Sequence, residues 1–153
     1  MHSVERGGEK MTVIESIRNF IKKCPYLEEF EGAIRIGVDY LDKESTTYSI
    51  EKVPSNPIIK KYVDGSCKKQ ELFIFSSRES YGQDVFNNLE NINFYEKFAE
   101  WLEEQNCNKN LPKLTGKYEA EKLEVTSNGY AFATDIDKAR YQIQLRLIYI
   151  ERK

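Results

Sequence analysis

A stretch near the end of the chain alternates apolar and polar residues. Large apolar residues occupy every second position between residues 140 and 150: Tyr141, Ile143, Leu145, Leu147 and Tyr149. Successive side chains of a β-strand point to opposite faces, so this pattern predicts a strand with one buried face. The intervening positions include Ile148 and Ile150, two apolar residues that a solvated face does not need. We expect this segment to be the longest strand of the fold.

Shorter segments with strand patterns lie upstream of this stretch. We expect strands at residues 34–40, around 48–50, and at 58–63, 72–75, 123–125 and 130–134. The run 72–75 is apolar throughout, which is typical of a central strand covered on both faces. Turns are expected at residues 42–45, 64–65, 127–129 and 135–138, and residues 127–129 (SNG) have the composition of a hairpin turn.

The N-terminal region has the spacing of a helix. Apolar residues recur every three or four positions after Thr12, and Thr12 and Glu15 have the spacing of a capping box. These signals predict a helix from Thr12 to about Lys23. Pro25 ends it, because the residue before a proline is pushed out of the helical region.

A second helical region covers residues 81–105. Asn91 and Asn93 interrupt its apolar pattern, and Asn93 repeats the capping-box spacing with Glu96. Two helices joined near residue 91 are therefore expected. The apolar face of the second piece is expected to consist of Tyr95, Phe98, Ala99 and Leu102.

The order of these elements indicates the fold class. A helix is followed by strands, then by helices, then by strands, and this order is typical of an α+β domain. The chain has 153 residues, of which 40% are hydrophobic, and this is enough for one packed core. We expect a single domain over residues 11–153, with an antiparallel or mixed β-sheet and helices packed against it.

Residues 1–10 are expected to lie outside this domain. Residues 6–10 (RGGEK) stand directly before Met11, and one reverse translation of them contains AGGAGG, the core of a bacterial ribosome-binding site. We interpret Met11 as the natural start and residues 1–10 as a translated leader. The alternative is a short disordered N-terminal arm, and the genomic codons distinguish the two.

The side chains needed for common catalytic mechanisms are scarce. His2 is the only histidine and lies in residues 1–10, which argues against a histidine base and against Ser-His or Cys-His nucleophiles. Cys24, Cys67 and Cys107 lack the C-x-x-C spacing of zinc and redox sites, and are expected to be reduced thiols. Because the expected domain also lacks a phosphate-binding glycine motif, we expect no catalytic residues, no cofactor and no enzyme activity.

Two polar segments have both a structural and a functional interpretation. Residues 76–80 (SSRES) stand between a predicted strand and a predicted helix, so we expect a loop whose hydroxyls cap the helix. Binding of an anion at the helix N-terminus is the alternative. Asp135 and Asp137 have a spacing that suits a divalent cation, but two acids in a turn are usually turn residues, so we expect no metal site.

The sequence does not point to a membrane or a nucleic acid as a partner. Its apolar runs are far shorter than the roughly 18 residues needed to cross a bilayer. The net charge is -2, and basic pairs such as Lys60-Lys61 and Lys68-Lys69 are surrounded by acids. A solvated surface explains these pairs better than a sequence-specific nucleic-acid site.

Two parts of the sequence resemble a known group of proteins. One comprises residues 73–82 (FIFSSRESYG) with the following stretch 87–101, and the other comprises residues 129–132 (GYAF) and 139–145 (ARYQIQL). Together they resemble the small minor capsid proteins of tailed phages and prophages of low-GC Gram-positive bacteria. Those proteins are similar in size and layout to tail-terminator proteins, also called tail completion proteins. The resemblance implies an α/β fold and a hexameric ring that caps the tail tube and joins it to the head.

The same resemblance implies a structural role. The chain would be a subunit of a phage, or of a phage-tail-like particle such as a contractile-tail bacteriocin. Its partners would be further copies of itself and a tail-tube, sheath or head-completion protein. It would lie in the bacterial cytoplasm during assembly and then in the particle. A head-completion or connector subunit is the alternative role, while a stand-alone enzyme or nucleotide-binding domain is disfavoured by the missing motifs.

Five charged residues are candidates for contacts between subunits. They lie in predicted loops or at a strand start: Arg78, Glu79, Asp135, Asp137 and Arg140. In a ring, an arginine of one subunit can meet an acid of the next in a head-to-tail contact that closes by rotation. The apolar pair on the polar face of the last strand is a second sign of a contact surface, unless a helix covers it.

Overall fold

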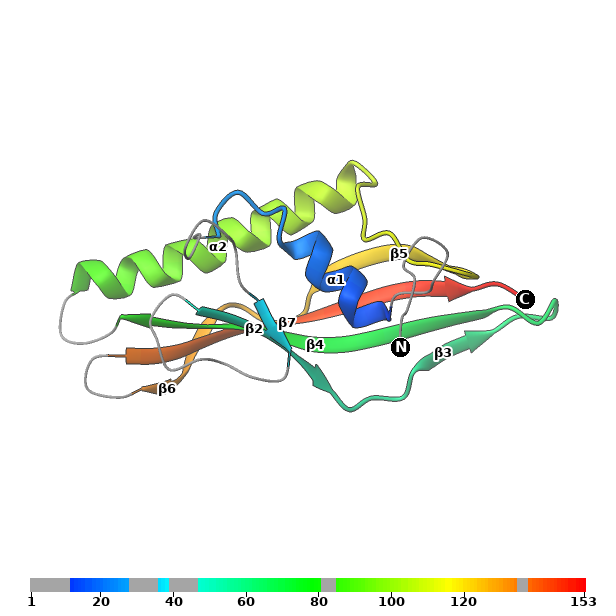
Figure 1. Cartoon of the computed structure of the whole chain (residues 1–153), viewed down its shortest axis with the longest axis horizontal. Coiled ribbons are helices and arrows are strands. Elements are labelled where there is room, and N and C mark those ends of the chain that lie inside the picture. The colour runs from blue at the N-terminus through cyan, green and yellow to red at the C-terminus, as the bar shows by residue number, and fades with distance from the viewer. Residues whose placement is uncertain (1–11, 28–35, 39–46, 81–84, 135–137) are drawn as a thin grey trace, which may run out of the picture.

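The computed structural model describes residues 12–27, 36–38, 47–80, 85–134 and 138–153. In this part of the chain seven strands form one mixed sheet and two helices pack against it, which confirms the predicted α+β class. Both helices lie on the same face of the sheet (Figure 1). The elements in chain order are α1 (Val13–Ile21), β1 (Ile36–Val38), β2 (Thr47–Val53), β3 (Ile58–Lys61), β4 (Cys67–Ser80), α2 (Val85–Cys107), β5 (Tyr118–Val125), β6 (Tyr130–Thr134) and β7 (Lys138–Glu151).

Two long strands form the middle of the sheet. The strand order is β1-β2-β4-β7-β5, with β3 also beside β4 and β6 also beside β7. The two central strands, β4 and β7, pair antiparallel over their whole length, from Cys67 opposite Glu151 to Ser80 opposite Lys138. Strand β7 confirms the long strand predicted at residues 140–150, and β4 has the same length of 14 residues.

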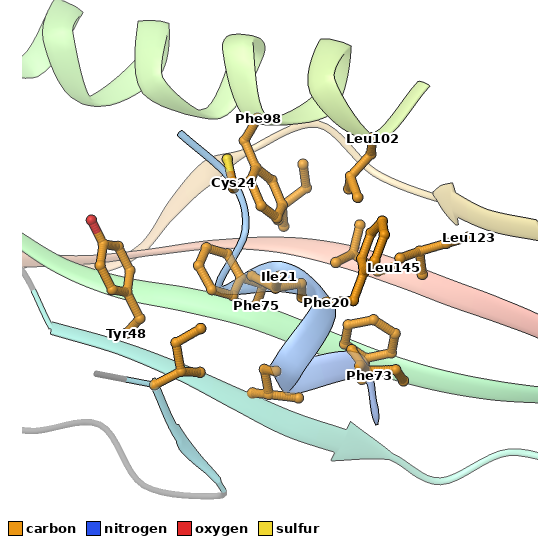
Figure 2. Packing of buried hydrophobic residues seen from close by; sticks show 14 of the residues in the cluster. Phe20, Ile21, Cys24, Tyr48, Phe73, Phe75, Phe98, Leu102, Leu123 and Leu145 are labelled. Atoms are coloured by element: carbon orange, nitrogen blue, oxygen red, sulfur yellow. The ribbon is translucent and has the colours of Figure 1, made fainter. Parts of the chain in front are cut away.

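The core lies between the sheet and the helices. The alternating residues of β7 are all buried, as predicted: Tyr141, Ile143, Leu145, Leu147 and Tyr149. On β4, Phe73 and Phe75 face the same way, and the ring of Phe75 stacks on that of Phe98 from α2 at 4.7 Å between centroids (Figure 2). Burial of each such side chain contributes about 1.5–3 kcal/mol, so this layer is the main source of stability.

The first helix has the predicted capping box. The backbone N–H of Glu15 donates to Thr12 Oγ1 at 3.1 Å, and the backbone N–H of Thr12 donates to Glu15 Oε1 at 2.9 Å. The helix ends at Ile21, two residues before the predicted end. Arg18 Nε donates to the carbonyl oxygen of Ile36 at 2.7 Å, which ties α1 to strand β1.

The second helix is one continuous element, and the predicted joint near residue 91 is wrong. Helix α2 runs through Asn91 and Asn93 without a break. Asparagine lowers helix stability by only about 0.7 kcal/mol relative to alanine. The burial of Tyr95, Phe98 and Leu102 against the sheet outweighs that cost, so packing decides the course of the helix.

Strand β4 is much longer than the predicted strand at 72–75. Residues 76–80, which we expected to form a capping loop, continue the strand and pair with residues 138–142 of β7. Both Ser76 and Ser77 are buried. The run is also not covered on both faces, because Leu72 and Ile74 are only half-buried. Pairing along both edges of β4 supplies partners for its backbone, which overrides the loop-like composition.

Residues 127–129 do not form the predicted hairpin turn. Strands β5 and β6 pair in succession with the same edge of β7, and they do not pair with each other. Ser127 fills the gap between them, because its Oγ accepts from the backbone N–H of Gln144 at 3.0 Å. A Cβ atom on Gly129 would lie 2.4 Å from Tyr95 Cβ, so glycine is needed there to let α2 approach.

Strands β1 and β2 pair as neighbours, but in parallel, with Ile36 opposite Tyr48. A parallel pair cannot be connected by a tight turn. The turn predicted at residues 42–45 lies outside the described residues. The strand predicted at 58–63 is confirmed as β3, which ends two residues earlier at Lys61, and the turn at residues 64–65 is confirmed by the positive φ of 96° at Gly65.

Candidate assembly interface

One face of the sheet is covered by neither α1 nor α2. We call it the open face, and it carries the side chains of β4 and β7 that alternate with the buried ones. The open face has apolar members that are only half-buried: Leu72, Ile74, Ile148 and Ile150. No helix in the described part of the chain explains the two isoleucines of β7, which the sequence singled out.

A chain of polar contacts crosses the open face near the N-terminal end of β7. Arg140 Nη2 lies 2.6 Å from Glu51 Oε1 on β2, and Arg140 Nε donates to Gln142 Oε1 at 3.2 Å. Gln142 Nε2 in turn donates to the hydroxyl of Tyr130 on β6 at 2.7 Å. We call these four residues the first network. It links strands on both sides of the central pair.

Small residues beneath the first network let it lie close to the sheet. Glu51 stands opposite Ile74, and Arg140 stands opposite Arg78, so their ion pair crosses β4 at Ser76. Ser76 and its neighbour Ser49 on β2 are fully buried, although both belong to the open face. A larger side chain at Ser76 would occupy the path of the ion pair.

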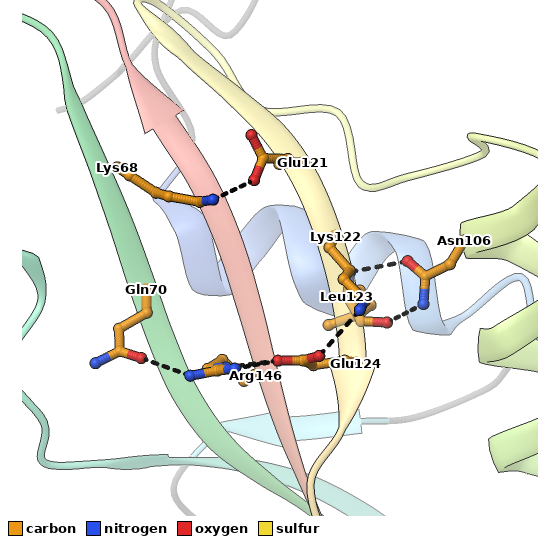
Figure 3. Close-up of polar contacts among 8 residues, drawn as sticks. All are labelled: Lys68, Gln70, Asn106, Glu121, Lys122, Leu123, Glu124 and Arg146. Atoms are coloured by element: carbon orange, nitrogen blue, oxygen red, sulfur yellow. Dashed lines mark hydrogen bonds and ion pairs between the residues drawn. The ribbon is translucent and has the colours of Figure 1, made fainter. Parts of the chain in front are cut away.

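A second network crosses the opposite half of the open face (Figure 3). Arg146 donates to Glu124 Oε2 through Nε at 2.7 Å and through Nη2, and its Nη1 reaches Gln70 Oε1 at 3.4 Å. Lys122 Nζ lies 3.3 Å from Glu124 Oε1. Burial opposes ionisation of Glu124, but the hydrogen bonds from Arg146 and Lys122 outweigh it and lower the pKa of this carboxyl.

The apolar residues of the open face lie between and beyond these networks. Ile74 is opposite Gln144, Leu72 is opposite Arg146, and Ile148 is opposite Gln70. The result is a surface of half-exposed apolar side chains among oriented arginines and carboxylates. Protein interfaces have this mixture of apolar and polar area, with arginine enriched.

The structure brings together two of the five predicted interface residues. Arg78 and Arg140 are cross-strand neighbours, both half-buried. Arg140 already pairs with Glu51 within the chain, a partner that no local pattern in the sequence indicates. Glu51 is the only acidic residue of β2 and lies on the open face, but its sequence neighbours give no sign that it pairs with Arg140. Arg78 also has an interaction within the chain. The side chains of Glu79, Asp135 and Asp137 lie outside the described residues.

A hairpin formed by β3 and β4 extends to one end of the molecule, away from both helices (Figure 1). Its turn is stabilised by Asp64, which accepts hydrogen bonds from the backbone N–H and hydroxyl of Ser66 at 2.9 and 2.6 Å. These bonds lower the pKa of Asp64. Three large apolar residues of the hairpin are exposed, and the side chain of Val63 is fully so: Ile59, Tyr62 and Val63.

A groove runs between α2 and the edge strand β5. Its apolar floor includes Leu102, Leu123 and Val125, and its rim carries acids of α2. The free edge of β5 is closed at one point by Asn106. The side-chain amide of Asn106 accepts from the backbone N–H of Leu123 at 2.9 Å and donates to its carbonyl oxygen, as a neighbouring strand would (Figure 3).

The described residues show little that could support catalysis. Burial raises the pKa of the Cys24 thiol to about 11, which keeps it protonated. The buried hydroxyl of Tyr95 donates to the carbonyl oxygen of Tyr141 at 3.1 Å and accepts from Ser77 at 2.6 Å, so it is a satisfied structural group. Within the described ranges, no three His, Cys, Asp or Glu side chains gather into a metal-binding group.

Neither helix in the described part of the chain is long and apolar enough to cross a bilayer.

Comparisons with known proteins do not assign the chain to a family. No protein-family model matches the chain, and no curated protein matches it.

Proposed function

We propose that the chain is a structural subunit of a phage or phage-tail-like particle, and that it forms a tail-terminator ring on the end of the tail tube. The observation that carries the proposal is the open face. A two-layer domain that uses one face of its sheet for its own core offers the other face to a neighbour.

The composition of the open face supports a protein partner. Its apolar side chains are half-exposed, and its charged side chains are held in fixed positions by the two networks. Pre-ordered arginines and carboxylates select a partner by charge complementarity, while the apolar residues contribute affinity. Arg78 and Arg140, the neighbouring arginines at one end of this face, are our candidates for contacting an acid of the adjoining protein.

The proposal is tested by reconstitution with the tail-tube protein encoded in the same gene cluster. We expect electron microscopy of negatively stained mixtures to show tubes whose ends carry an added ring, and tubes alone to lack it. The gene should lie just upstream of the tube or sheath genes. Tubes with unchanged ends, together with binding to a head-completion protein, would assign the chain to the head side instead.

A further inference from the structure

We propose that copies of this chain join when the β3–β4 hairpin of one copy inserts into the α2–β5 groove of the next. This contact rests on the proposed function only in assuming that copies of the chain bind one another to form a ring. The hairpin and the groove are separate surfaces of the subunit, so the contact is heterologous and can close into a ring.

The hairpin presents an apolar tip beside exposed lysines. Two of its lysines are engaged within the subunit, since Lys68 pairs with Glu121 at 3.0 Å and Lys69 pairs with Glu151 at 2.7 Å. Lys60 and Lys61 are exposed and have no ion pair among the described residues. Lys60 lies over the ring of Tyr62, with its Nζ 5.3 Å from the ring centroid.

The groove presents the opposite charge. Glu96, Glu100 and Glu103 follow one another at helical spacing along α2 and line the groove. All three are exposed, and none forms an ion pair with another described residue. Exposed Ile92 extends the apolar part of the groove toward the start of the helix.

The two surfaces therefore match in two independent respects. Exposed apolar residues at the hairpin tip meet an apolar floor, and exposed lysines meet exposed glutamates, none of which forms an ion pair among the described residues. Attraction between such charges speeds encounter and fixes register, while burial of the apolar tip adds affinity. Neither set of exposed side chains has a comparable partner within the described part of its own subunit.

Docking of side chains fits this groove better than addition of a strand. An incoming strand would need the N–H and C=O groups along the free edge of β5. Asn106 already occupies those of Leu123. A hairpin whose tip enters between α2 and β5 leaves the Asn106 contact intact, so the edge protection and the docking site coexist.

Charge reversal on each surface tests the contact. The hairpin variant is K60E/K61E and the groove variant is E100K/E103K, and sedimentation velocity of the full chain measures self-association over a range of concentrations. We expect each variant alone to associate about tenfold more weakly than the natural protein at low salt. All four positions are exposed, so both variants are expected to fold.

An equimolar mixture of the two variants tests whether the hairpin and the groove contact each other directly. The reversed hairpin of one variant then meets the reversed groove of the other, and the natural hairpin meets the natural groove, so association should return to within about threefold of the natural value. The matched control is K23E/K113E, which carries the same charge change at exposed lysines away from both surfaces. The control should associate like the natural protein.

A disulfide trap gives an independent readout. In a C67S background, V63C places a thiol at the tip, and the exposed natural Cys107 lies in the groove lining. We expect mild oxidation to give species linked between residues 63 and 107, and these links should disappear in a C107S control.

A natural protein that stays monomeric, or association that none of the charge reversals weakens, would overturn the hairpin contact. Tube binding by the natural protein would still support the proposed function in that event.

Discussion

The two faces of the sheet are organised by different physics. The face toward the helices is a close-packed layer in which Phe75, Leu145 and Phe98 have no exposed surface. The open face is held by cross-strand polar contacts between residues far apart in sequence, such as Arg140 and Glu51, which are separated by 89 positions. One face therefore stabilises the domain through close packing, and the other is ordered by ion pairs and hydrogen bonds at its surface.

The largest expected effect is a cavity in the helix-side layer. Leu145→Ala should lower the free energy of unfolding by about 2–5 kcal/mol, because the removed methyl groups leave a void that the packed layer cannot fill. Urea denaturation measures the change. A loss below about 0.5 kcal/mol, as for a surface position, would show that the two faces do not differ in this way.

A smaller cost is expected where α2 meets the sheet. Gly129→Ala should destabilise the domain by about 1–3 kcal/mol, because the new Cβ would lie 2.4 Å from that of Tyr95 and the helix must move. Thermal melts measure the change in stability. Asn128→Ala, at the exposed neighbouring position, is the matched control and should leave stability nearly unchanged. Equal stability of the two variants would contradict the close approach of α2.

On the open face, the cost should depend on leaving a charge unpaired. Arg140→Met should cost about 1–2 kcal/mol, because the half-buried Glu51 loses its partner. Adding Glu51→Met should recover most of that loss. A double-mutant cycle by chemical denaturation measures the coupling. A double variant as unstable as the sum of the single variants would show that the first network is not a coupled unit.

The smallest expected effect is on the pH dependence of stability. The pKa of Glu124 is lowered in the folded protein, so its contribution is present above the ordinary value near 4.5 and is lost as the pH falls through the lowered value. Glu124→Gln should therefore flatten the fall in stability below pH 4.5, by less than about 1 kcal/mol for an ion pair this close to solvent. Parallel denaturation curves of the two proteins at pH 7 and pH 3.5 measure this, and identical pH profiles would count against the second network.

Elements that bury one face against the core were predictable from local periodicity, whereas elements that depend on long-range strand pairing were not. Local periodicity was enough for the buried residues of β7, the helical face of Tyr95, Phe98 and Leu102, and the capping box of Thr12. It failed where long-range pairing decides the outcome. Residues 76–80 look like a loop until β7 pairs with them, and residues 127–129 look like a hairpin turn until both flanking strands pair with β7.

The candidate surfaces were predictable to a lesser degree. Ile148 and Ile150 marked the open face correctly, because an apolar residue on a polar face is visible in one strand alone. The pairing of Arg140 with Glu51 was not visible, since it needs the order of β2, β4 and β7. The closing of the β5 edge by Asn106 likewise depends on the approach of α2 to that strand.

We propose that the open face contacts the adjoining protein of the particle, and affinity for the tail-tube protein measures this contact. The open-face variant I74E/I148E should bind the tube protein at least about tenfold more weakly than the natural chain in biolayer interferometry. The control V38E carries an apolar-to-acid change at an exposed position of the edge strand β1 and should bind normally. Circular dichroism melts establish that all three proteins are folded. Equal affinity of the open-face variant and the natural chain would show that the open face does not contact the tail-tube protein.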